Sequence, residues 1–565
     1  MTAWDRPEGG REPAAAALLG WLADPGAPSL CLVSGPPACG KSSLLAWLIR
    51  HGSRTGTAAE RTVHAVVPVA ARSVAGSVWA LAEQLGIAAA SGGELAGLLA
   101  RDGRRTVLVL PNAERESVAR LAVLLADAPG VRVIVEARTG SPAHRVLGGD
   151  RAAVLDLGLP QWTDPESRAR RPAALPSAPP GAAAPDDVPA GFDPADGASL
   201  CAADPQHVTA LLEAEDPAAT RVPGLRAAWF RAGPALVRDT APAERAVALL
   251  LALGPDGDPG LRTSLEAVAA GASWRVNWRL AKGNPVPPWP GPVVALAPAG
   301  GEGPGAVLAL DPAGTVRRLA VADGAPLGRL PGAAPASGAC VLSDGSVLLL
   351  HPAGGIGVEA AWSTHTASTG IEALLQERRP ASDALASALR GRRGTALVSG
   401  AAPGGDVVAL GRSTGEVLVA GAAEGQVRLH DGPVTAVSVV AVPVNEAESA
   451  VLVYSGGADG AVRLWVPGGA PMDGAYRRRS CAVAAVHAAR TPYGPLLAVA
   501  WSDGLLELCA TASGRVRAFH AGRPARAVCV TPAGEVLVGL DDALVRLSPD
   551  LLDTDGVPMP VRATD

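Results

Sequence analysis

The second half of the chain repeats one short pattern, a polar turn followed by an apolar strand, and this repeat constrains the fold more than any other feature. The turn is usually Asp-Gly or Ala-Gly between two apolar runs, which is a strong signal for a β-hairpin. We therefore expect residues 272–565 to form antiparallel sheets joined by tight turns. The repeats are DPAGTVRRL (311–319), LSDGSVLLL (342–350), AAEGQVRLH (422–430), GADGAVRLW (457–465), WSDGLLEL (501–508) and LDDALVRL (540–547).

The spacing of these repeats indicates a β-propeller. Most neighbouring turns are separated by roughly 40 residues, which is the length of one blade in a WD40-like propeller. The interval between Gly345 and Gly425 is about twice as long, and it predicts a blade without the turn signal in 351–405, where 371–391 looks helical and could be an insertion. The total is then about seven blades. The segment WRVNWRLAKG (274–283) is predicted to close the ring by pairing with the last blade.

The first part of the chain has a different periodicity. Short apolar runs of strand length alternate with longer segments whose apolar residues recur at helical spacing. This alternation predicts an α/β fold with a parallel sheet. The expected strands are 29–34, 62–71, 105–110 and 131–138, and the expected helices are 12–23, 42–52, 74–86 and 114–127.

Between the first expected strand and the next helix, residues 35–42 read Gly-x-x-x-x-Gly-Lys-Ser. In a P-loop of this pattern, backbone N–H groups surround the phosphates of a nucleotide, the lysine contacts the β- and γ-phosphates, and the serine hydroxyl binds Mg²⁺. Lys41 is one of only two lysines among 49 Lys plus Arg residues, the other being Lys282, which favours a working site over a chance match. The residues expected to bind ATP are Gly35, Pro36, Pro37, Ala38, Cys39, Gly40, Lys41, Ser42 and Ser43, with Ser42 also holding Mg²⁺.

A P-loop enzyme also needs a carboxylate at the end of a nearby strand to hold Mg²⁺. The candidate strand 105–110 is followed by Pro111, where that aspartate is expected. Asn112 offers only a neutral carbonyl as a metal ligand, and Glu114 is the first carboxylate after the strand, so we expect nucleotide binding with slow hydrolysis. Arg138, at the end of the following strand, either senses the γ-phosphate or is an ordinary surface arginine. Glu114 and Arg138 are the candidate catalytic residues.

These patterns divide the chain into four parts. We expect a P-loop nucleotide-binding α/β domain over 1–168, a helical domain over 199–271 and the propeller over 272–565. Residues 169–198 are rich in proline and alanine and have no periodicity, which is typical of a linker or a long disordered insertion.

The composition argues against several classes of protein. A net charge of -5 and a pI of about 6.0 are unlike the basic character of nucleic-acid-binding domains. The N-terminus lacks the apolar core of a signal peptide, and the most apolar stretch, 246–254, is too short to span a bilayer. The seven cysteines include no Cys-x-x-Cys pair, which is typical of a reduced cytoplasmic protein. Cys39 is either a redox-sensitive thiol activated by Lys41 or a residue that fills a small space.

In their order along the chain, the N-terminal motifs resemble a bacterial STAND-type (NACHT/AAA+-related) P-loop NTPase. Such proteins often carry a helical middle region and a C-terminal WD40-like propeller. The chain departs from the family at Pro111, where an aspartate is usual, and at Arg115, where an acidic residue is frequent. The resemblance rests on GGRE (9–12), GPPACGKSSLLAWL (35–48), VHAVVPVAAR (63–72), VAGSVWALAEQLG (74–86), TVLVLPNAE (106–114) and VIVEARTG (133–140).

The resemblance implies a nucleotide-dependent switch that binds ATP between its α/β and helical domains, self-associates under control and senses a protein partner through its propeller. Lys41 and Ser42 match the phosphate and magnesium positions, Arg138 matches the sensor position, and Gly10 and Arg11 would lie near the base. We therefore predict a cytoplasmic ATP-binding regulatory protein with weak or no hydrolysis, a protein partner, and no nucleic-acid or membrane contact. The alternative is a non-enzymatic propeller scaffold with a vestigial nucleotide-binding domain, or a propeller that only restrains that domain within the chain.

Overall fold

The protein consists of two compact units in the computed structural model. The first covers Met1–Val237 and the second Arg238–Asp565, so the boundary falls inside the expected helical domain 199–271. Most of the predicted linker 169–198 lies outside the described residues. The structure describes residues 4–70, 72–149, 151–164, 166, 192–215, 222–238, 241–254, 256–281, 292–299, 305–330, 332, 334–359, 380–445 and 448–550.

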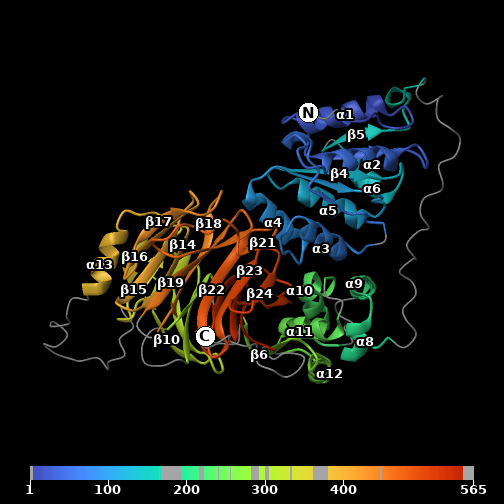
Figure 1. Ribbon diagram of the computed structural model, residues 1–565. Helices are drawn as coiled ribbons and strands as arrows, with labels where there is room; N and C mark the ends of the chain where they lie inside the picture. The colour runs from blue at the N-terminus through green and yellow to red at the C-terminus, as the bar shows by residue number, and fades with distance from the viewer. Residues whose placement is uncertain are drawn as a thin grey trace. The chain divides into compact units, whose positions relative to one another are not determined.

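The first unit is built on a five-stranded parallel sheet (Figure 1). Its strands are β1 (Leu30–Ser34), β2 (Ala65–Val66), β3 (Thr106–Leu110), β4 (Val131–Glu136) and β5 (Ala152–Asp156). Their order across the sheet is β2-β3-β4-β1-β5. The three central strands are buried along their whole length, as expected of a parallel sheet covered on both faces. Because the strands are parallel, their carboxyl ends meet at one edge of the sheet.

Helices cover this sheet on both faces. On one face, Leu18 of the first helix and Leu48 of the second meet Val33 and Ile134 in a common core. On the other face, the fifth helix packs against β1 and β4. The helices are α1 (Glu12–Ala23), α2 (Lys41–Gly52), α3 (Val74–Gln84), α4 (Gly92–Asp102), α5 (Glu116–Ala126) and α6 (Pro142–Leu147), with short 3-10 helices η1 (Ala59–Arg61) and η2 (Pro160–Trp162).

The expected parallel α/β arrangement is confirmed, with local differences. β5, α4 and α6 have no counterpart among the expected elements. β5 lies at the edge of the sheet and only one of its five residues is fully buried, so it has no long apolar run to reveal it. The expected strand 62–71 is reduced to Ala65–Val66, because Pro68 has no N–H group with which to continue the ladder.

Three further helices lie among the described residues of the first unit. They are α8 (Gly197–Ala202), α9 (Pro205–Ala214) and α10 (Leu225–Leu236). The carboxylate of Glu213 accepts hydrogen bonds from the backbone N–H groups of Val74 (3.1 Å) and Ala75 (2.7 Å) at the start of α3. The buried ring of Trp79 on α3 lies 6.4 Å from that of Phe230 on α10. A helix-capping carboxylate and an aromatic contact thus join α9 and α10 to the α/β fold.

The second unit begins with two helices and continues as a series of small antiparallel sheets. The helices are α11 (Pro242–Ala252) and α12 (Pro259–Ala269), and a later helix is α13 (Pro380–Leu389). The first three sheets contain β7 (Ala295–Pro298), β8 (Ala306–Leu310), β9 (Val316–Ala320) and β10 (Pro326–Leu330); β11 (Gly338–Val341), β12 (Val347–Leu350) and β13 (Ile356–Glu359); and β14 (Ala396–Ala402), β15 (Gly405–Gly411), β16 (Glu416–Gly421) and β17 (Gly425–Arg428). The next three contain β18 (Val434–Pro443), β19 (Ser449–Gly457), β20 (Ala461–Trp465) and β21 (Arg477–Arg478); β22 (Val483–Thr491), β23 (Gly494–Trp501), β24 (Leu505–Ala510) and β25 (Val516–His520); and β26 (Ala525–Val530), β27 (Val536–Leu540) and β28 (Ala543–Pro549) with β6 (Trp274–Ala281).

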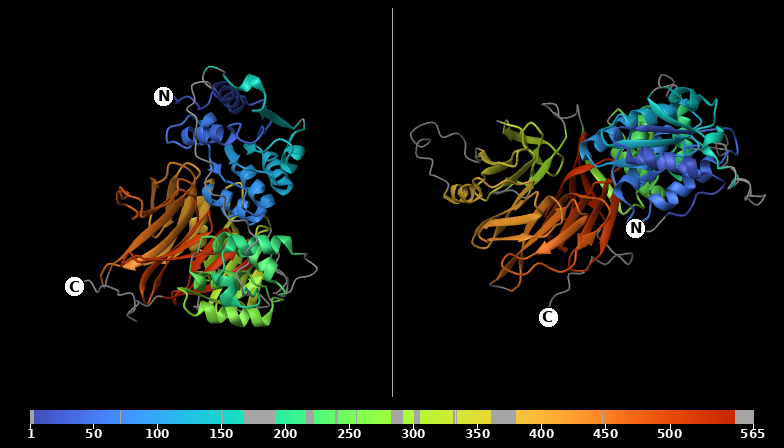
Figure 2. Two further views of the ribbon diagram at one scale, coloured as in Figure 1. Left: turned by 90° about the vertical axis from the view of Figure 1, so that its right-hand side faces the viewer. Right: turned by 90° about the horizontal axis from the view of Figure 1, so that it is seen from above.

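These sheets are the blades of a β-propeller, as the sequence predicts. The innermost strands β7, β11, β14, β18, β22 and β26 contact one another in this order, and β26 also contacts β7, which closes the ring. Figure 2 shows the blades following one another, coloured from yellow-green to red. β6 pairs antiparallel with β28, so the predicted closing strand is confirmed.

The prediction of about seven blades is wrong, because the described strands form six. The turn signals mark different turns of a blade: Gly345 lies between β11 and β12, whereas Gly425 begins β17. The turn between the second and third strands of a blade contains Gly354 in the second blade and Gly415 in the third, both with positive φ. The segment 351–405 holds parts of these two blades and the inserted helix α13, which lengthens the interval without adding a blade.

Helix α11 packs against the closing strand of the propeller. Val247 and Leu251 of α11 share a buried core with Trp274 of β6. In the part of the chain that the structure describes, none of the helices has the length and apolar character needed to cross a membrane.

Candidate functional site

The loop that carries the Gly-x-x-x-x-Gly-Lys-Ser motif connects β1 to α2. α2 begins at Lys41, directly after Gly40, whose φ of 93° is left-handed, and no side chain caps the helix. Its first backbone N–H groups therefore have no helical carbonyl to bind. Gly35 has a φ of 145°, and a Cβ atom there would lie 2.6 Å from Cys39 Sγ. Both glycines are required by the backbone, so the segment folds as the expected strand, tight loop and helix.

Lys41 is buried, with 8% of its surface exposed. Its Nζ donates hydrogen bonds to the carbonyl oxygens of Gly35 (2.9 Å) and Pro36 (3.0 Å), and it lies 3.8 Å from Cys39 Sγ. Among the described residues, no carboxylate forms an ion pair with this ammonium group. A largely buried cation held only by neutral groups is a position that favours an anion.

Ser42 contacts a carboxylate that the sequence reasoning does not single out. Its hydroxyl donates a 2.7 Å hydrogen bond to Glu136 Oε1, at the end of β4. The exposed Asn112, expected as a metal ligand through its side chain, instead donates its backbone N–H to Glu136 Oε2 at 3.3 Å. Glu136 is itself only 2% exposed. The sequence signal that could have identified it is a single carboxylate at the end of an otherwise buried strand, VRVIVE.

The two residues predicted to be catalytic, Glu114 and Arg138, lie next to each other. Glu114 Oε1 accepts a hydrogen bond from the backbone N–H of Arg138 at 3.1 Å, and the Arg138 Nε atom lies 3.8 Å from Glu114 Oε2. The next residue, Thr139, donates its N–H to the carbonyl of Gly35 at 3.3 Å. Both candidates are therefore brought beside the loop, with their side chains partly exposed.

The N-terminal residues Gly10 and Arg11 contact the same region. Arg11 is buried and donates hydrogen bonds to Thr163 Oγ1 (2.7 Å) and to the carbonyl oxygen of Cys39. The carbonyl of Gly10 accepts a 2.7 Å hydrogen bond from the N–H of Asp164. Arg11 thus connects the loop backbone to the segment after β5.

The remaining loop residues differ in exposure. Pro36, Pro37, Ala38 and Ser43 are exposed, so the outer side of the loop is open to a ligand. Cys39 is half-buried and packs against the apolar core that α1, α2 and β1 form.

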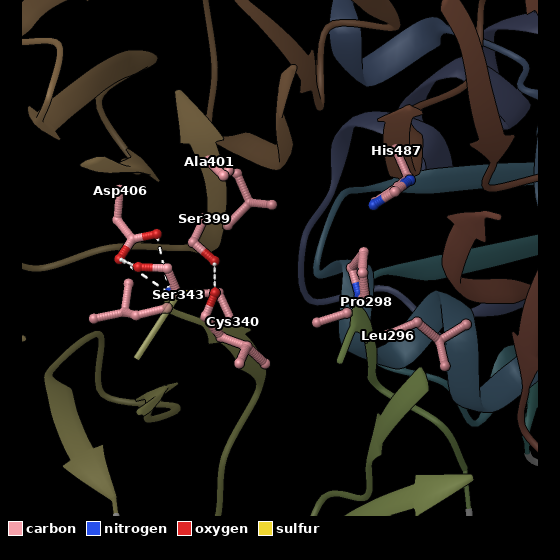
Figure 3. Close-up of a pocket in the computed structure, with 13 residues that line it drawn as sticks. Leu296, Pro298, Cys340, Ser343, Ser399, Ala401, Asp406 and His487 are labelled. Atoms are coloured by element: carbon pink, nitrogen blue, oxygen red, sulfur yellow. Dashed lines mark hydrogen bonds between the residues drawn. The ribbon is translucent and has the colours of Figure 1, made fainter. Parts of the chain in front are cut away.

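The second unit contains a cavity of about 180 Å³ lined by residues of β7, β11, β14 and β22. Figure 3 shows Asp406 bonded to Ser343 on one side of this cavity and His487 on the other. The carboxylate of Asp406 accepts hydrogen bonds from Ser343 N–H (3.0 Å) and Oγ (2.8 Å). His487 Nδ1 accepts one from the N–H of Val530 (3.0 Å). Both side chains form hydrogen bonds within the propeller, so we assign them a structural role in the ring.

The propeller also contains a buried Ser-His-Asp arrangement. His430 Nδ1 lies 3.0 Å from Asp459 Oδ1, and its Nε2 lies 2.9 Å from Ser455 Oγ. These are the pairings of a catalytic triad, but the His430 side chain has no exposed surface. The network therefore fixes the turn between β19 and β20, which contains Asp459.

We expect the stability of the propeller to decrease at acidic pH because of His487. Burial lowers the pKa of its imidazole to about 4, whereas the pKa in an unfolded chain is about 6.5. Below about pH 6.5 the unfolded chain binds the proton first, so the free energy of unfolding falls by up to about 3 kcal/mol on approaching pH 4. Protonation would also remove the acceptor for Val530 N–H.

His487→Asn is the matched variant, because its carbonyl oxygen can accept the Val530 hydrogen bond without titrating. Thermal unfolding between about pH 7.5 and about pH 4.5 is expected to show a shallower loss of stability in the variant. His520, whose pKa burial also lowers to about 4, is unchanged in both proteins. Parallel pH profiles would contradict the assignment to His487.

No protein-family model matches the chain, and no curated protein is similar to it. Among solved structures, the crystal structure of RRP9 WD40 repeats aligns with 49% of this chain and 98% of that chain, with 12% sequence identity and a TM-score of 0.31. The propeller is defined here by the pairing of its own strands.

Proposed function

We propose that this protein is an ATP-binding regulatory protein, in which the nucleotide binds at the loop 35–43 and the propeller binds a protein partner. The observation that carries the proposal is the ammonium group of Lys41, which is buried at the start of α2 and held only by loop carbonyl groups and a cysteine sulfur among the described residues. The motif and its resemblance to STAND-type P-loops support the same site.

A phosphate at this position would gain from several groups at once. Lys41 would exchange its carbonyl partners for a charge-assisted hydrogen bond, which is stronger than a neutral one. The uncapped N–H groups of α2 and the positive end of its dipole would face the same anion. The exposed outer residues of the loop leave access from solvent.

A calorimetric titration of the full chain with ATP, ADP and GTP in the presence of EDTA tests the site without a metal contribution. We expect saturable binding of ATP or ADP to one site per chain, with GTP as the measure of base selectivity. The absence of binding for all three nucleotides would contradict the proposal.

Hydrolysis is expected to be slow. Pro111 supplies no carboxylate at the end of β3 that could act as a base for the attacking water, and Glu114 already accepts a hydrogen bond from the Arg138 backbone. Phosphate release by the isolated full chain with ATP and Mg²⁺ measures this directly. Turnover on the order of 1–10 per second, as in typical enzymes, would contradict the expectation.

The propeller is the part proposed to bind the partner. Its radial arrangement of blades leaves only the short outer strands as sheet edges, so the loops at its two faces are the main surfaces available for recognition. Among the described residues, no group of metal-ligating side chains indicates a chemical role for it. Partners retained by the full chain can be cross-linked with a carboxylate-directed reagent, because the chain has only two lysines. Cross-links confined to the first unit would contradict this assignment.

A further inference from the structure

We infer that Glu136 is the acidic residue of the magnesium site, in the role that an aspartate at position 111 would have filled. The inference rests on the proposed function, because the ion would be bound together with the phosphates of ATP. Glu136 lies on β4, whereas the P-loop pattern predicts the carboxylate directly after β3.

The sheet topology brings Glu136 to the required level. β4 lies between β3 and β1. In the register of these strands, Leu110 is opposite Val135 and Val33 is opposite Glu136. Glu136 is therefore level with Pro111 on one side and with the end of β1 on the other. A carboxylate here is one strand nearer to the loop than any side chain at position 111.

The contacts of Glu136 match a cation site. Its Oε1 accepts the hydrogen bond from Ser42, the residue whose hydroxyl would bind Mg²⁺, at 2.7 Å. Its Oε2 accepts only the 3.3 Å hydrogen bond from Asn112 N–H. No basic side chain among the described residues pairs with this buried carboxylate. A hard divalent cation prefers such hydroxyl and carboxylate oxygens and would neutralise the buried charge.

Two other carboxylates at this edge of the sheet have different surroundings. Glu114 is bound to Arg138. Asp156 lies on the opposite side of β1, opposite Ser34, and its Oδ1 accepts a 2.9 Å hydrogen bond from Gly158 N–H. Asp156 is therefore a matched control for Glu136: it ends the other neighbour of β1 and carries the same charge, without contact to Ser42 in the hydrogen bonds described.

The test measures ATP affinity of the full chain by calorimetry, once in EDTA and once in excess Mg²⁺, for the wild type, Glu136→Gln and Asp156→Asn. We expect Mg²⁺ to strengthen ATP binding about tenfold or more in the wild type and in Asp156→Asn. In Glu136→Gln this gain should be lost, while the affinity in EDTA stays equal or increases because a negative charge near the phosphates has been removed. Electron paramagnetic resonance with Mn²⁺ and ATP provides a second measurement, in which Glu136→Gln is expected to bind a smaller fraction of the Mn²⁺ than the wild type.

The outcomes separate the two proposals. An equal Mg²⁺ gain in Glu136→Gln and Asp156→Asn overturns the role of Glu136. Wild-type binding of ATP that is strong in EDTA and unchanged by Mg²⁺ also overturns it, but leaves the nucleotide site intact. No ATP binding under either condition overturns both. If Glu136→Gln is unfolded by circular dichroism, Glu136→Asp, which keeps the charge on a shorter side chain, is used instead. We expect it to retain only part of the Mg²⁺ gain, and a gain equal to that of the wild type overturns the role of Glu136.

Discussion

Lys41→Ala is expected to weaken ATP and ADP binding by at least about 2 kcal/mol, or roughly 30-fold. The variant removes the one buried cation of the loop, which now bonds to the carbonyl oxygens of Gly35 and Pro36. Its loss leaves the phosphates without the charge-assisted hydrogen bond that the loop provides. Calorimetry in EDTA is the appropriate measurement, because it excludes any change in Mg²⁺ binding.

Arg50→Ala is the control for this experiment. Arg50 lies on the same helix, is exposed, and belongs to the last turn rather than the first. It changes the net charge of the protein by the same amount, so it corrects for long-range electrostatics, and we expect nearly wild-type affinity. Equal affinities of Lys41→Ala and wild type would show that the loop is not the nucleotide site.

Trp274→Ala is expected to destabilise the propeller by about 3–5 kcal/mol. Trp274 is 1% exposed, its ring lies 5.9 Å from that of Phe519, and its Nε1 donates a 2.9 Å hydrogen bond to the carbonyl of Ala518. Removing the ring leaves a cavity in the core that β6 shares with α11 and the last two blades. Because β6 completes the sixth blade, this loss weakens the closure of the ring.

Hydrogen exchange measured by mass spectrometry on the full chain can locate the effect. We expect peptides from β6 and β28 to lose protection first in Trp274→Ala, together with a lower melting temperature. Trp274→Phe keeps an aromatic ring but loses the hydrogen bond to Ala518 and part of the buried ring volume, so its cost should be smaller, about 1–3 kcal/mol. Arg275→Ala, an exposed neighbour on the same strand, should be nearly neutral. Unchanged protection of β6 in Trp274→Ala would refute its role in closure.

Much of the fold could be predicted from the periodicity of apolar residues. The α/β order and the closing strand depend on local patterns: apolar strands such as 106–110, helices that begin after turn residues, and an alternating segment at 274–281. The number of blades could not be predicted in this way. The hairpin signals at Gly345 and Gly425 come from different turns within their blades, and only the pairing of strands reveals which turns are equivalent.

The candidate site also has one part that the sequence predicts and one that it does not. The loop 35–43 could be proposed as a nucleotide site because such a site requires a contiguous set of residues, here with Gly35 and Gly40 at two positions of positive φ and a lysine at the start of the helix. The sequence by itself therefore predicted a nucleotide site and determined the position of the loop between a strand and a helix. Glu136 was recognised only in the tertiary structure, because its proximity to Ser42, 94 residues away, depends on β4 lying beside β1 in the sheet. Strand order and register are set by the packing of the whole unit, and no local pattern around either residue encodes them.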